Sequence, residues 1–577
     1  MTKIEEIRHS LSHLLAMAVL EKFPKVKLGI GPTIENGFYY DFALPAKALA
    51  EAELPNLEKR MRELIKENIK FERGEISKKE AEKIFKNQPF KLELLKELKE
   101  KPVIYNSGNF TDLCAGPHVQ STNEINPEPF KLMKIAGAYW RGDEKNPMLT
   151  RIYGVAFNTK KELDGYLKLQ EEAEKRDHRK IGKELDLFSF HEEGAGFPFW
   201  HPKGMIIYNE LVNFISKENE KRGYGEVKTP PILRKNLWII SGHWEKFKEN
   251  MYFTEIEGEE FAIKPMNCPG GLLIYKENLH SYRDLPLRYS EFGLVHRHEL
   301  SGVLHGLFRV RSFTQDDAHV FCAAEQLNNE IIQMVDYALD VYKTFGFDKY
   351  EIFIATKPEK YIGDDNVWEK ATDALEESLK SKKIKYGIKK GEGAFYGPKI
   401  EFNIKDAIGR NWQLGTIQVD FSMPARFDAF YIAQDGKKQN PVMVHRAILG
   451  SLERFIGILI EHYAGALPVW LSPVQIKIIP VSEKFNDYGE KVLTGLKKNN
   501  IRTEIDNSNE TLGKRIRTAE LQKIPYILVV GEKEKKSGTV AVRSRKGPAE
   551  SEPRQRRDEG QIKLEKFIEK IKGDLHV

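Results

Sequence analysis

The sequence predicts an α+β protein made of several domains, and three observations support this fold class. A chain of 577 residues is long enough for about three or four domains, each with its own core. Residues 287–319 have the composition of two strands joined by a glycine-rich loop, as in an antiparallel hairpin. From about residue 470 onward, strand-like and helix-like segments alternate, which is typical of a compact α/β unit.

The overall composition is that of a soluble globular protein. Charged residues make up 31% of the chain and apolar residues 41%, and the formal net charge of +6 allows an anionic partner without requiring one. Three cysteines, Cys114, Cys268 and Cys322, lie far apart, which disfavours a disulfide framework and fits a cytoplasmic location. The N-terminus is too polar for a secretory signal. The most apolar run, residues 455–471, is interrupted by charged residues and proline, so we expect no membrane span.

The first part of the chain carries histidine and cysteine pairs at helical spacing. A helix predicted over residues 5–23 places His9 and His13 one turn apart on the same face, and a later turn carries Cys114 and His118 at the same spacing. These are residue types that bind zinc, but no glutamate lies between the first two histidines to serve as a metalloprotease base. Three alternatives remain open: a metal site, a metal-free pocket that positions and deprotonates a water, and surface histidines beside one buried cysteine.

The central part of the chain predicts a connector followed by a sheet-rich domain. Residues 159–185 are rich in lysine and glutamate and predict a solvated connecting helix. An amphipathic helix from residue 205 to about 222 leads into an extended segment that ends at Pro231. Cys268 lies in a turn of prolines and glycines just before a helix, a place that suits a thiolate ligand better than a core thiol.

The hairpin at residues 287–319 carries side chains suited to a nucleoside triphosphate. Arg297 precedes its loop, Arg309 follows it, and Arg454 ends a later strand-to-helix segment. Arginine forks match phosphate oxygens, Phe313 can stack on a purine, and Glu299 can accept from an exocyclic amine. The chain has no Gly-x-x-x-x-Gly-Lys-[Ser/Thr] loop and no Gly-x-Gly-x-x-Gly after a strand, which excludes Walker and Rossmann sites.

These residues resemble the class II aminoacyl-tRNA synthetases. The parts that look like the three motifs of that class are Pro231, the pair Arg297-x-Glu299 and Arg309-x-x-x-Phe313, and Gly450-x-x-x-Arg454. Three segments narrow the resemblance to the threonyl-tRNA synthetases: Met-Asn-Cys-Pro at 266–269, Phe-Thr-Gln-Asp-Asp-Ala-His at 313–319, and His-Arg-Ala-Ile-Leu-Gly-Ser at 445–451. The resemblance extends from about residue 5 almost to the C-terminus.

The resemblance implies an antiparallel class II catalytic core that activates threonine with ATP and Mg²⁺. One Zn²⁺ per subunit is implied in the threonine pocket, held by Cys268, His319 and His445 with one position open, as in catalytic zinc sites. The implied catalytic residues are Arg297, Arg309, Lys399 and Arg454. The implied ATP contacts are Arg297, Glu299, Arg309, Phe313, Gln413 and Arg454. The implied threonine contacts are Met266, Arg297, Gln315, Asp317 and Tyr396.

The resemblance also gives the N-terminal histidines a purpose. A pocket that demands a hydroxyl rejects valine but not serine, because one missing methyl is worth only about 1–3 kcal/mol, or roughly 10–200-fold. A second site that hydrolyses mischarged seryl-tRNA is therefore expected. Its implied residues are His9, His13, Tyr40, Lys91, Asp112, Cys114 and His118. Threonyl enzymes are thought to edit without a metal, whereas the related alanyl-type domain binds zinc, so both alternatives stay open.

We therefore expect an α+β editing domain, a helical linker, the class II catalytic domain and an α/β anticodon-binding domain, at residues 1–158, 159–185, 186–468 and 469–577. The candidate anticodon contacts are Asn509, Glu534 and Arg543. The expected partners are tRNA(Thr), ATP, L-threonine and, through the first motif, a second copy in a homodimer. Many bacterial members begin with a small ubiquitin-like domain, whereas this sequence starts at the editing helix, so we expect a bacterial type without that domain.

Two rival interpretations remain at this stage. Another class II synthetase, such as the seryl or prolyl type, would keep its activity after zinc is removed. A non-catalytic RNA-binding regulator derived from a synthetase is disfavoured because every ATP-binding arginine is present.

Overall fold

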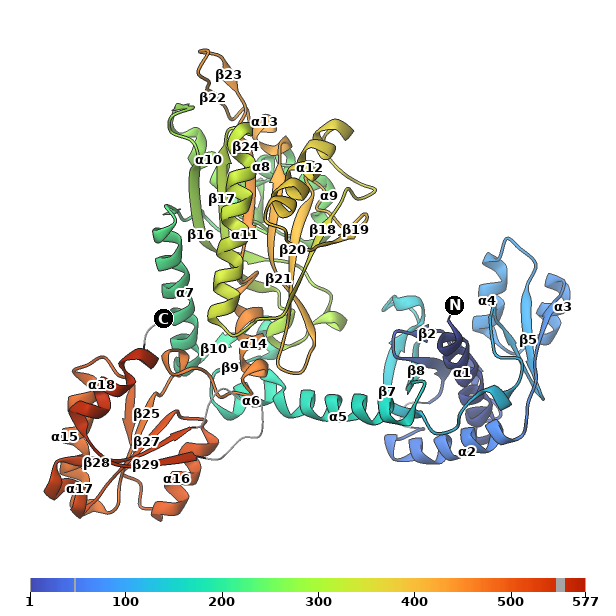
Figure 1. Cartoon of the computed structure of the whole chain (residues 1–577). Coiled ribbons are helices and arrows are strands. Elements are labelled where there is room, and N and C mark those ends of the chain that lie inside the picture. Colours follow the sequence, from blue (N-terminus) through green and yellow to red (C-terminus); the bar gives the residue numbers. More distant parts are fainter. Residues whose placement is uncertain (1, 46–47, 546–555, 576–577) are drawn as a thin grey trace. The chain divides into compact units, whose positions relative to one another are not determined.

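The computed structural model describes residues 2–45, 48–545 and 556–575 (Figure 1). Its contacts divide the chain into two compact units, Met1–Glu171 and Glu172–Val577. Within these described residues, no helix is both long enough and apolar enough to cross a membrane.

The first unit packs helices against two antiparallel sheets. The helices are α1 (Lys3–Lys22), α2 (Leu54–Lys66), α3 (Lys78–Ile84) and α4 (Pro89–Glu97). The larger sheet has the order β1-β3-β8-β7, with β2 paired to β3: β1 (Lys27–Leu28), β2 (Thr33–Ile34), β3 (Gly37–Ala43), β7 (Phe130–Tyr139) and β8 (Met148–Ala156). The smaller sheet contains β4 (Phe71–Glu75), β5 (Val103–Ser107) and β6 (Phe110–Leu113).

Helix α1 begins and packs as its sequence predicts. Thr2 and Glu5 form a capping box at its N-terminus, which satisfies main-chain donors that the first turn leaves free. Its buried face includes Leu11, Leu14 and Leu15, which join the core of the first unit. His13 is buried on the same helix, so the packing of α1 fixes where this imidazole lies.

The connector is two helices, where a single solvated helix was expected. Helix α5 (Lys160–Arg176) ends just before Asp177, and α6 (His178–Glu184) begins just after it. The Asp177 carboxylate accepts the main-chain N–H of Arg179 at 2.8 Å, so this aspartate caps a new helix. His178 and Ile181 on α6 are buried, and α6 is therefore part of a core and not a solvated spacer.

An eight-stranded, mostly antiparallel sheet forms the centre of the second unit (Figure 1). Its order is β11 (Gly225–Glu226), β16 (Leu287–His296), β17 (Ser312–Cys322), β24 (Val442–Ala447), β21 (Asn411–Asp420), β20 (Lys399–Lys405), β18 (Tyr350–Ala355) and β19 (Gly387–Lys389). The helices that share its core are α7 (Pro202–Lys221), α11 (Leu327–Thr344), α12 (Asp365–Ser381) and α14 (Leu452–His462).

The two faces of this sheet differ in chemistry. Ile400, Phe402 and Ile404 on β20 are completely buried in the core, as their period-2 spacing predicts. The alternate residues of β20, including Lys399 and Glu401, therefore lie on the opposite, polar face. That face carries the candidate site.

Smaller elements surround the sheet. The helices are α8 (Lys235–Ile240), α9 (His243–Lys246), α10 (Cys268–Lys276) and α13 (Ser422–Arg426). The strands are β9 (Phe188–Ser189), β10 (Phe199–Trp200), β12 (Ile232–Arg234), β13 (Tyr252–Ile256), β14 (Glu259–Ile263), β15 (His280–Ser281), β22 (Tyr431–Ile432) and β23 (Lys438–Gln439).

The C-terminal part is an α/β fold with the sheet order β26-β25-β27-β28-β29. Its strands are β25 (Ile476–Pro480), β26 (Thr503–Ile505), β27 (Tyr526–Val530), β28 (Thr539–Arg545) and β29 (Arg556–Lys563). Its helices are α15 (Asn486–Lys497), α16 (Leu512–Leu521), α17 (Glu532–Ser537) and α18 (Leu564–Leu575). Residues 561–563 belong to β29 and not to the last helix, because pairing with β28 supplies the hydrogen bonds of that segment.

Candidate functional site

The predicted hairpin is confirmed, and its second strand presents a row of polar side chains. Strands β16 and β17 pair antiparallel from Leu287 opposite Phe321 to His296 opposite Ser312. Successive side chains of a strand point to opposite faces. The face of β17 that carries the candidate site therefore presents Phe313, Gln315, Asp317 and His319.

Cys268, His319 and His445 come together although they are far apart in sequence. His319 on β17 lies directly opposite His445 on β24, with ring centroids 5.1 Å apart, and Cys268 begins helix α10. One ligand atom from each lies within 4.8 Å of the others. The Nε2 atom of His319 is buried and has no hydrogen-bond partner among the described residues.

This donor set fits zinc. One sulfur and two imidazole nitrogens are ligands that Zn²⁺ prefers, and three protein ligands leave one position for a substrate. Burial lowers the pKa of His319 to about 4, so its imidazole is neutral near pH 7, as metal binding requires. Burial raises the pKa of the Cys268 thiol, so a bound cation would displace the thiol proton.

Residues implied to contact threonine surround this triad. The ring of Tyr396 lies 5.0 Å from that of His445, and its hydroxyl donates to Gln418 Oε1 at 2.8 Å. Asn267 Nδ2 donates to Asp317 Oδ2 at 3.0 Å and so fixes this carboxylate beside the triad.

The structure adds His243, a residue not predicted from the sequence, which lies next to the predicted threonine contact Met266. Its Nε2 atom is 3.1 Å from the sulfur of Met266, and its ring lies 5.4 Å from that of Phe395. Burial lowers the pKa of His243 to about 3, so the imidazole is neutral near pH 7. A single buried histidine on a short helix has no partner at a regular spacing, so no sequence pattern marks it.

The predicted ATP residues lie along the same hairpin. Arg297 Nε donates to the carbonyl of Pro265 at 3.2 Å, and its guanidinium lies 5.0 Å from the ring centroid of Phe313. Arg309 Nε donates to Glu299 Oε2 at 2.9 Å, with most of the arginine side chain exposed. An arginine fork and an aromatic face thus adjoin the pocket that holds Cys268 and His319.

Arg454 on α14 completes a cationic site. Its Nε atom is buried and has no hydrogen-bond partner among the residues that the structure describes. Burial and the nearby charge of Arg309 both lower the pKa of Arg454. Two cations that repel each other beside an unused buried donor form a site that an anion such as phosphate would stabilise.

A β-bulge aims Gln413 into the site. Glu401 pairs with Thr416, but the next pair on that face joins Asn403 to Gln413, so β21 contains one extra residue there. Directly paired residues share a face of the sheet. Gln413 therefore points to the polar face, although a strict period of two from Thr416 would place it on the opposite one.

Lys399 is held by a carboxylate on its own strand. Its Nζ lies 2.6 Å from Glu401 Oε1, and Lys389 Nζ lies 2.7 Å from Glu401 Oε2. Glu401 thus bridges two lysines and fixes the direction of the predicted catalytic one.

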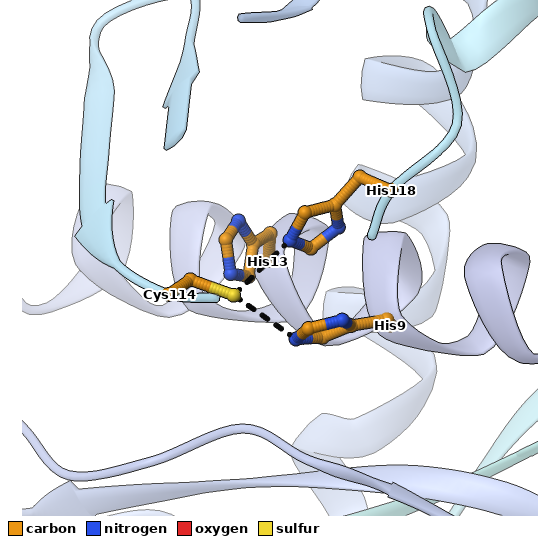
Figure 2. Close-up of side chains that lie close together, drawn as sticks. All are labelled: His9, His13, Cys114 and His118. Carbon is orange, nitrogen blue, oxygen red and sulfur yellow. Dashed lines mark hydrogen bonds between the residues drawn. The ribbon is translucent and has the colours of Figure 1, made fainter. Parts of the chain in front are cut away.

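A second cluster lies in the first unit (Figure 2). Figure 2 shows His9, His13, Cys114 and His118 converging, and one ligand atom from each lies within 4.8 Å of the others. The sulfur of Cys114 is 3.2 Å from His9 Nε2 and 3.3 Å from His118 Nε2. The surface-histidine alternative is therefore wrong, because His13 and His118 are buried and all four side chains converge.

Hydrogen bonds define which ring nitrogens carry protons in this cluster. His9 Nδ1 lies 3.1 Å from the carbonyl of Pro117, which can only accept, so the proton is on Nδ1. His118 Nδ1 lies 3.2 Å from Ser10 Oγ, and that hydroxyl already donates to the carbonyl of Glu6. Both rings thus present unprotonated Nε2 atoms to Cys114, an arrangement that suits either a metal ion or a water that must lose a proton.

A buried polar network supports the cluster from one side. Lys91 Nζ lies 2.5 Å from Asp112 Oδ1, and the Tyr40 hydroxyl donates to Asp112 Oδ2 at 2.5 Å. His13 Nε2 is 3.6 Å from the same carboxylate. Burial raises the pKa of the Cys114 thiol to about 12 and lowers the pKa of His118, so both groups are uncharged near pH 7.

The three candidate anticodon residues lie in different settings. Asn509 is in an exposed loop before α16, and Arg543 lies on β28 opposite Ile527. Glu534 is buried, and its carboxylate accepts from the main-chain N–H of Gly531 at 2.9 Å and from Gln561 at 2.7 Å. These bonds give Glu534 a role inside the fold, which weakens the expectation that it contacts RNA.

Comparison with protein families identifies the class of protein to which the chain belongs. The family model described as "tRNA synthetase class II core domain (G, H, P, S and T)" matches residues 252–463. The model of the "Anticodon binding domain" matches residues 475–574. The model of the "Threonyl and Alanyl tRNA synthetase second additional domain" matches residues 103–153. With the antiparallel sheet and the arginine site, these matches define a class II aminoacyl-tRNA ligase.

Individual relatives give the family within this class. The chain is 56% identical over 573 residues to a threonine–tRNA ligase of Clostridium botulinum (strain Kyoto / Type A2), covering 99% of this chain and 88% of the relative. It is 55% identical over 568 residues to a threonine–tRNA ligase of Acetivibrio thermocellus, covering 98% and 87%. A solved structure titled as the RNA binding domain of threonyl-tRNA synthetase from Cryptosporidium parvum superposes with a TM-score of 0.65 at 39% identity, over 69% of this chain and 98% of that one. The chain belongs to the threonine–tRNA ligase family.

Proposed function

We propose that the chain activates L-threonine with ATP and Mg²⁺, transfers it to the terminal adenosine of tRNA(Thr), and hydrolyses seryl-tRNA(Thr) at a second site. The observation that carries this proposal is the buried triad of Cys268, His319 and His445 beside the Arg297–Phe313 pair. One pocket thus combines residues for a hydroxylated amino acid with residues for a nucleotide.

The ATP side works by positioning and by neutralising charge. Arg297 is placed to bind the α-phosphate, Arg309 and Arg454 the outer phosphates, and Phe313 the adenine. Glu299, Gln413 and Lys399 complete this site in our proposal. Preorganised cations of this kind hold the reactants in line and stabilise the charge that develops at phosphorus.

On the amino-acid side, we propose that Cys268, His319 and His445 would hold one Zn²⁺. When bound, the ion supplies a Lewis-acid position for the amino and hydroxyl groups of threonine. The chain's own contacts to threonine are proposed to be Met266, Arg297, Gln315, Asp317 and Tyr396. A pocket that requires a hydroxyl leaves its polar groups unpaired when valine enters, and this is why valine is rejected.

The N-terminal cluster is proposed to clear serine. His9, His13, Cys114 and His118 would position and deprotonate the water that attacks the ester of seryl-tRNA, with Tyr40, Lys91 and Asp112 fixing the pocket. The unprotonated Nε2 atoms of His9 and His118 support either a metal-free site or one that holds a metal.

The proposed domain organisation follows the expected boundaries with one change. Residues 1–158 would edit, 186–468 would catalyse and 469–577 would bind the anticodon, with Asn509, Glu534 and Arg543 as candidate contacts. Helix α6 (His178–Glu184) is assigned to the catalytic domain, because its buried residues pack with that domain's core. We further propose a homodimer located in the cytoplasm.

Threonylation of tRNA tests this proposal. The full chain, supplied with ATP, Mg²⁺, tRNA(Thr) and radiolabelled threonine, is expected to form acid-precipitable threonyl-tRNA. No product formation with threonine, or equal charging with proline, would contradict the proposed activity.

A further inference from the structure

His178 lies at the start of α6 and touches both elements that carry the proposed outer-phosphate arginines. It is 0% exposed, and its ring centroid is 4.1 Å from that of Phe308. Phe308 immediately precedes Arg309. On the other side of His178 lies helix α14, which carries Arg454.

One ring nitrogen of His178 holds the base of the Arg309 loop. The main-chain N–H of Leu307 donates to His178 Nε2 at 2.9 Å. The loop is closely fitted there: a Cβ added at Gly306, whose φ is +49°, would lie 2.2 Å from the same Nε2 atom. The position of Arg309, two residues beyond Leu307, therefore depends on where this imidazole lies.

The other ring nitrogen holds the end of α14. Because Nε2 accepts, the ring proton lies on Nδ1, which donates to Glu461 Oε1 at 2.6 Å. The main-chain N–H of His178 donates to the same oxygen at 3.0 Å. Glu461 lies two helical turns after Arg454, and Arg410 Nη2 is 2.6 Å from its second oxygen.

The same residues do not form a metal site. Asp177, His178 and Glu461 offer ligand atoms within 4.8 Å of one another. Both ring nitrogens of His178 are already engaged, however, and Glu461 is neutralised by Arg410. A cation placed there would have to displace Leu307 and would meet the charge of Arg410.

We infer that His178 is a positioning residue for ATP, which joins the loop of Arg309 to the helix of Arg454 through one imidazole. This inference rests on the proposed function, since it presumes that both arginines bind the outer phosphates. It also makes the second helix of the connector a part of the ATP site and not a spacer.

Two substitutions separate the two hydrogen bonds. In His178→Asn the amide nitrogen takes the place of Nδ1 and still reaches Glu461, but Leu307 loses its acceptor. In His178→Gln the amide oxygen reaches the place of Nε2 and can accept from Leu307 again. Threonine-dependent ATP–pyrophosphate exchange is measured on the full chain, with KM determined separately for ATP and for threonine.

We expect His178→Asn to raise the KM for ATP about 10-fold, the effect of an unsatisfied buried N–H, and to leave the KM for threonine within about 2-fold. His178→Gln should recover most of the ATP affinity. His280→Asn is the matched control, since it replaces another buried histidine, whose Nε2 bonds to the carbonyl of Tyr275 at 2.8 Å outside the ATP site.

An unchanged KM for ATP in His178→Asn would overturn the inference. So would a result in which the KM for ATP and the KM for threonine rise equally, and do so in both His178→Asn and His178→Gln. If His178→Asn does not fold, Gly306→Ala replaces it, because the added methyl would displace the loop from His178 while the imidazole itself is kept; an unchanged KM for ATP in that variant also overturns the inference. Wild-type chain that lacks threonine-dependent exchange would instead reject the proposed function.

Discussion

His319 and His445 lie directly opposite each other on β17 and β24, and their ring centroids are 5.1 Å apart. Opposite residues of an antiparallel pair share one face of the sheet, so this register alone directs both imidazoles into the pocket. Cys268 joins them from the first turn of α10. The pocket is thus built by the register of two paired strands and the first turn of one helix.

Replacing Cys268 with serine is expected to abolish threonine activation. A hydroxyl is a much poorer zinc ligand than a thiolate, so we predict an exchange rate lower by about 100-fold or more, together with loss of bound zinc. Metal analysis and pyrophosphate exchange measure the two effects. Cys322→Ser is the control, because that cysteine is equally buried but lies in the core. Normal exchange with one zinc per subunit in Cys268→Ser would refute the pocket assignment.

The double substitution His9→Ala with His13→Ala should separate editing from activation. The two histidines belong to the first unit, whereas the threonine pocket belongs to the second. We predict unchanged threonine-dependent exchange but accumulation of seryl-tRNA(Thr) when serine is supplied, measured by charging with radiolabelled serine. Deacylation of seryl-tRNA at the wild-type rate would remove the editing role of this cluster.

Replacing Arg454 with alanine should weaken ATP binding specifically. A hydrogen bond to a charged group is worth about 1.5–3 kcal/mol, which corresponds to a rise in the KM for ATP of roughly 10–100-fold. The KM for threonine should change little. Arg283→Ala, which removes an exposed arginine, serves as the control. Equal ATP affinity in the wild type and Arg454→Ala would show that this side chain does not hold phosphate.

Glu453 should make the stability of the second unit depend on pH. Burial raises the pKa of Glu453 to about 7, while its carboxylate accepts the main-chain N–H of Thr314 at 2.9 Å. Between the ordinary glutamate pKa of about 4.5 and this raised value, the folded chain keeps a proton that the unfolded chain releases. The contribution of Glu453 to the free energy of unfolding is therefore fully present below about pH 4.5 and is lost as the pH rises through about 7. Its size is about 3 kcal/mol.

Denaturant midpoints at about pH 5 and pH 8 measure this effect. Glu453→Gln keeps an oxygen acceptor but cannot titrate, so its stability should fall less than that of the wild type across this range. Parallel loss of stability in the two proteins would mean that Glu453 is ionised throughout.

Much of the site could be predicted from local sequence. The hairpin at residues 287–319 follows from composition and turn residues, and the alternation along β17 places Phe313, Gln315, Asp317 and His319 on one face. The pair His9 and His13 follows from helical spacing. That these histidines meet Cys114 and His118, or that His319 meets His445, required the family resemblance, because contacts between distant segments leave no trace in spacing.

The remaining features depend on tertiary structure. Asp177 divides the connector because it caps a second helix, and the buried side of α6 appears only when α14 is in place. The bulge that aims Gln413 into the site arises from pairing with β20, and residues 561–563 become strand because β28 offers them hydrogen bonds. The Asp177 cap is local, but in the other cases a partner that is distant in sequence decides the local conformation.

Amino-acid-dependent pyrophosphate exchange with threonine, serine and valine tests whether the buried triad of Cys268, His319 and His445 selects a hydroxylated amino acid. If the buried triad selects a hydroxyl, exchange should be fastest with threonine, measurable with serine at about 10–200-fold lower efficiency, and negligible with valine. Removal of zinc by a chelator should abolish the exchange with threonine and with serine. Exchange with valine at a rate comparable to that with serine, or full activity without zinc, would show that the triad does not select the hydroxyl through a bound metal.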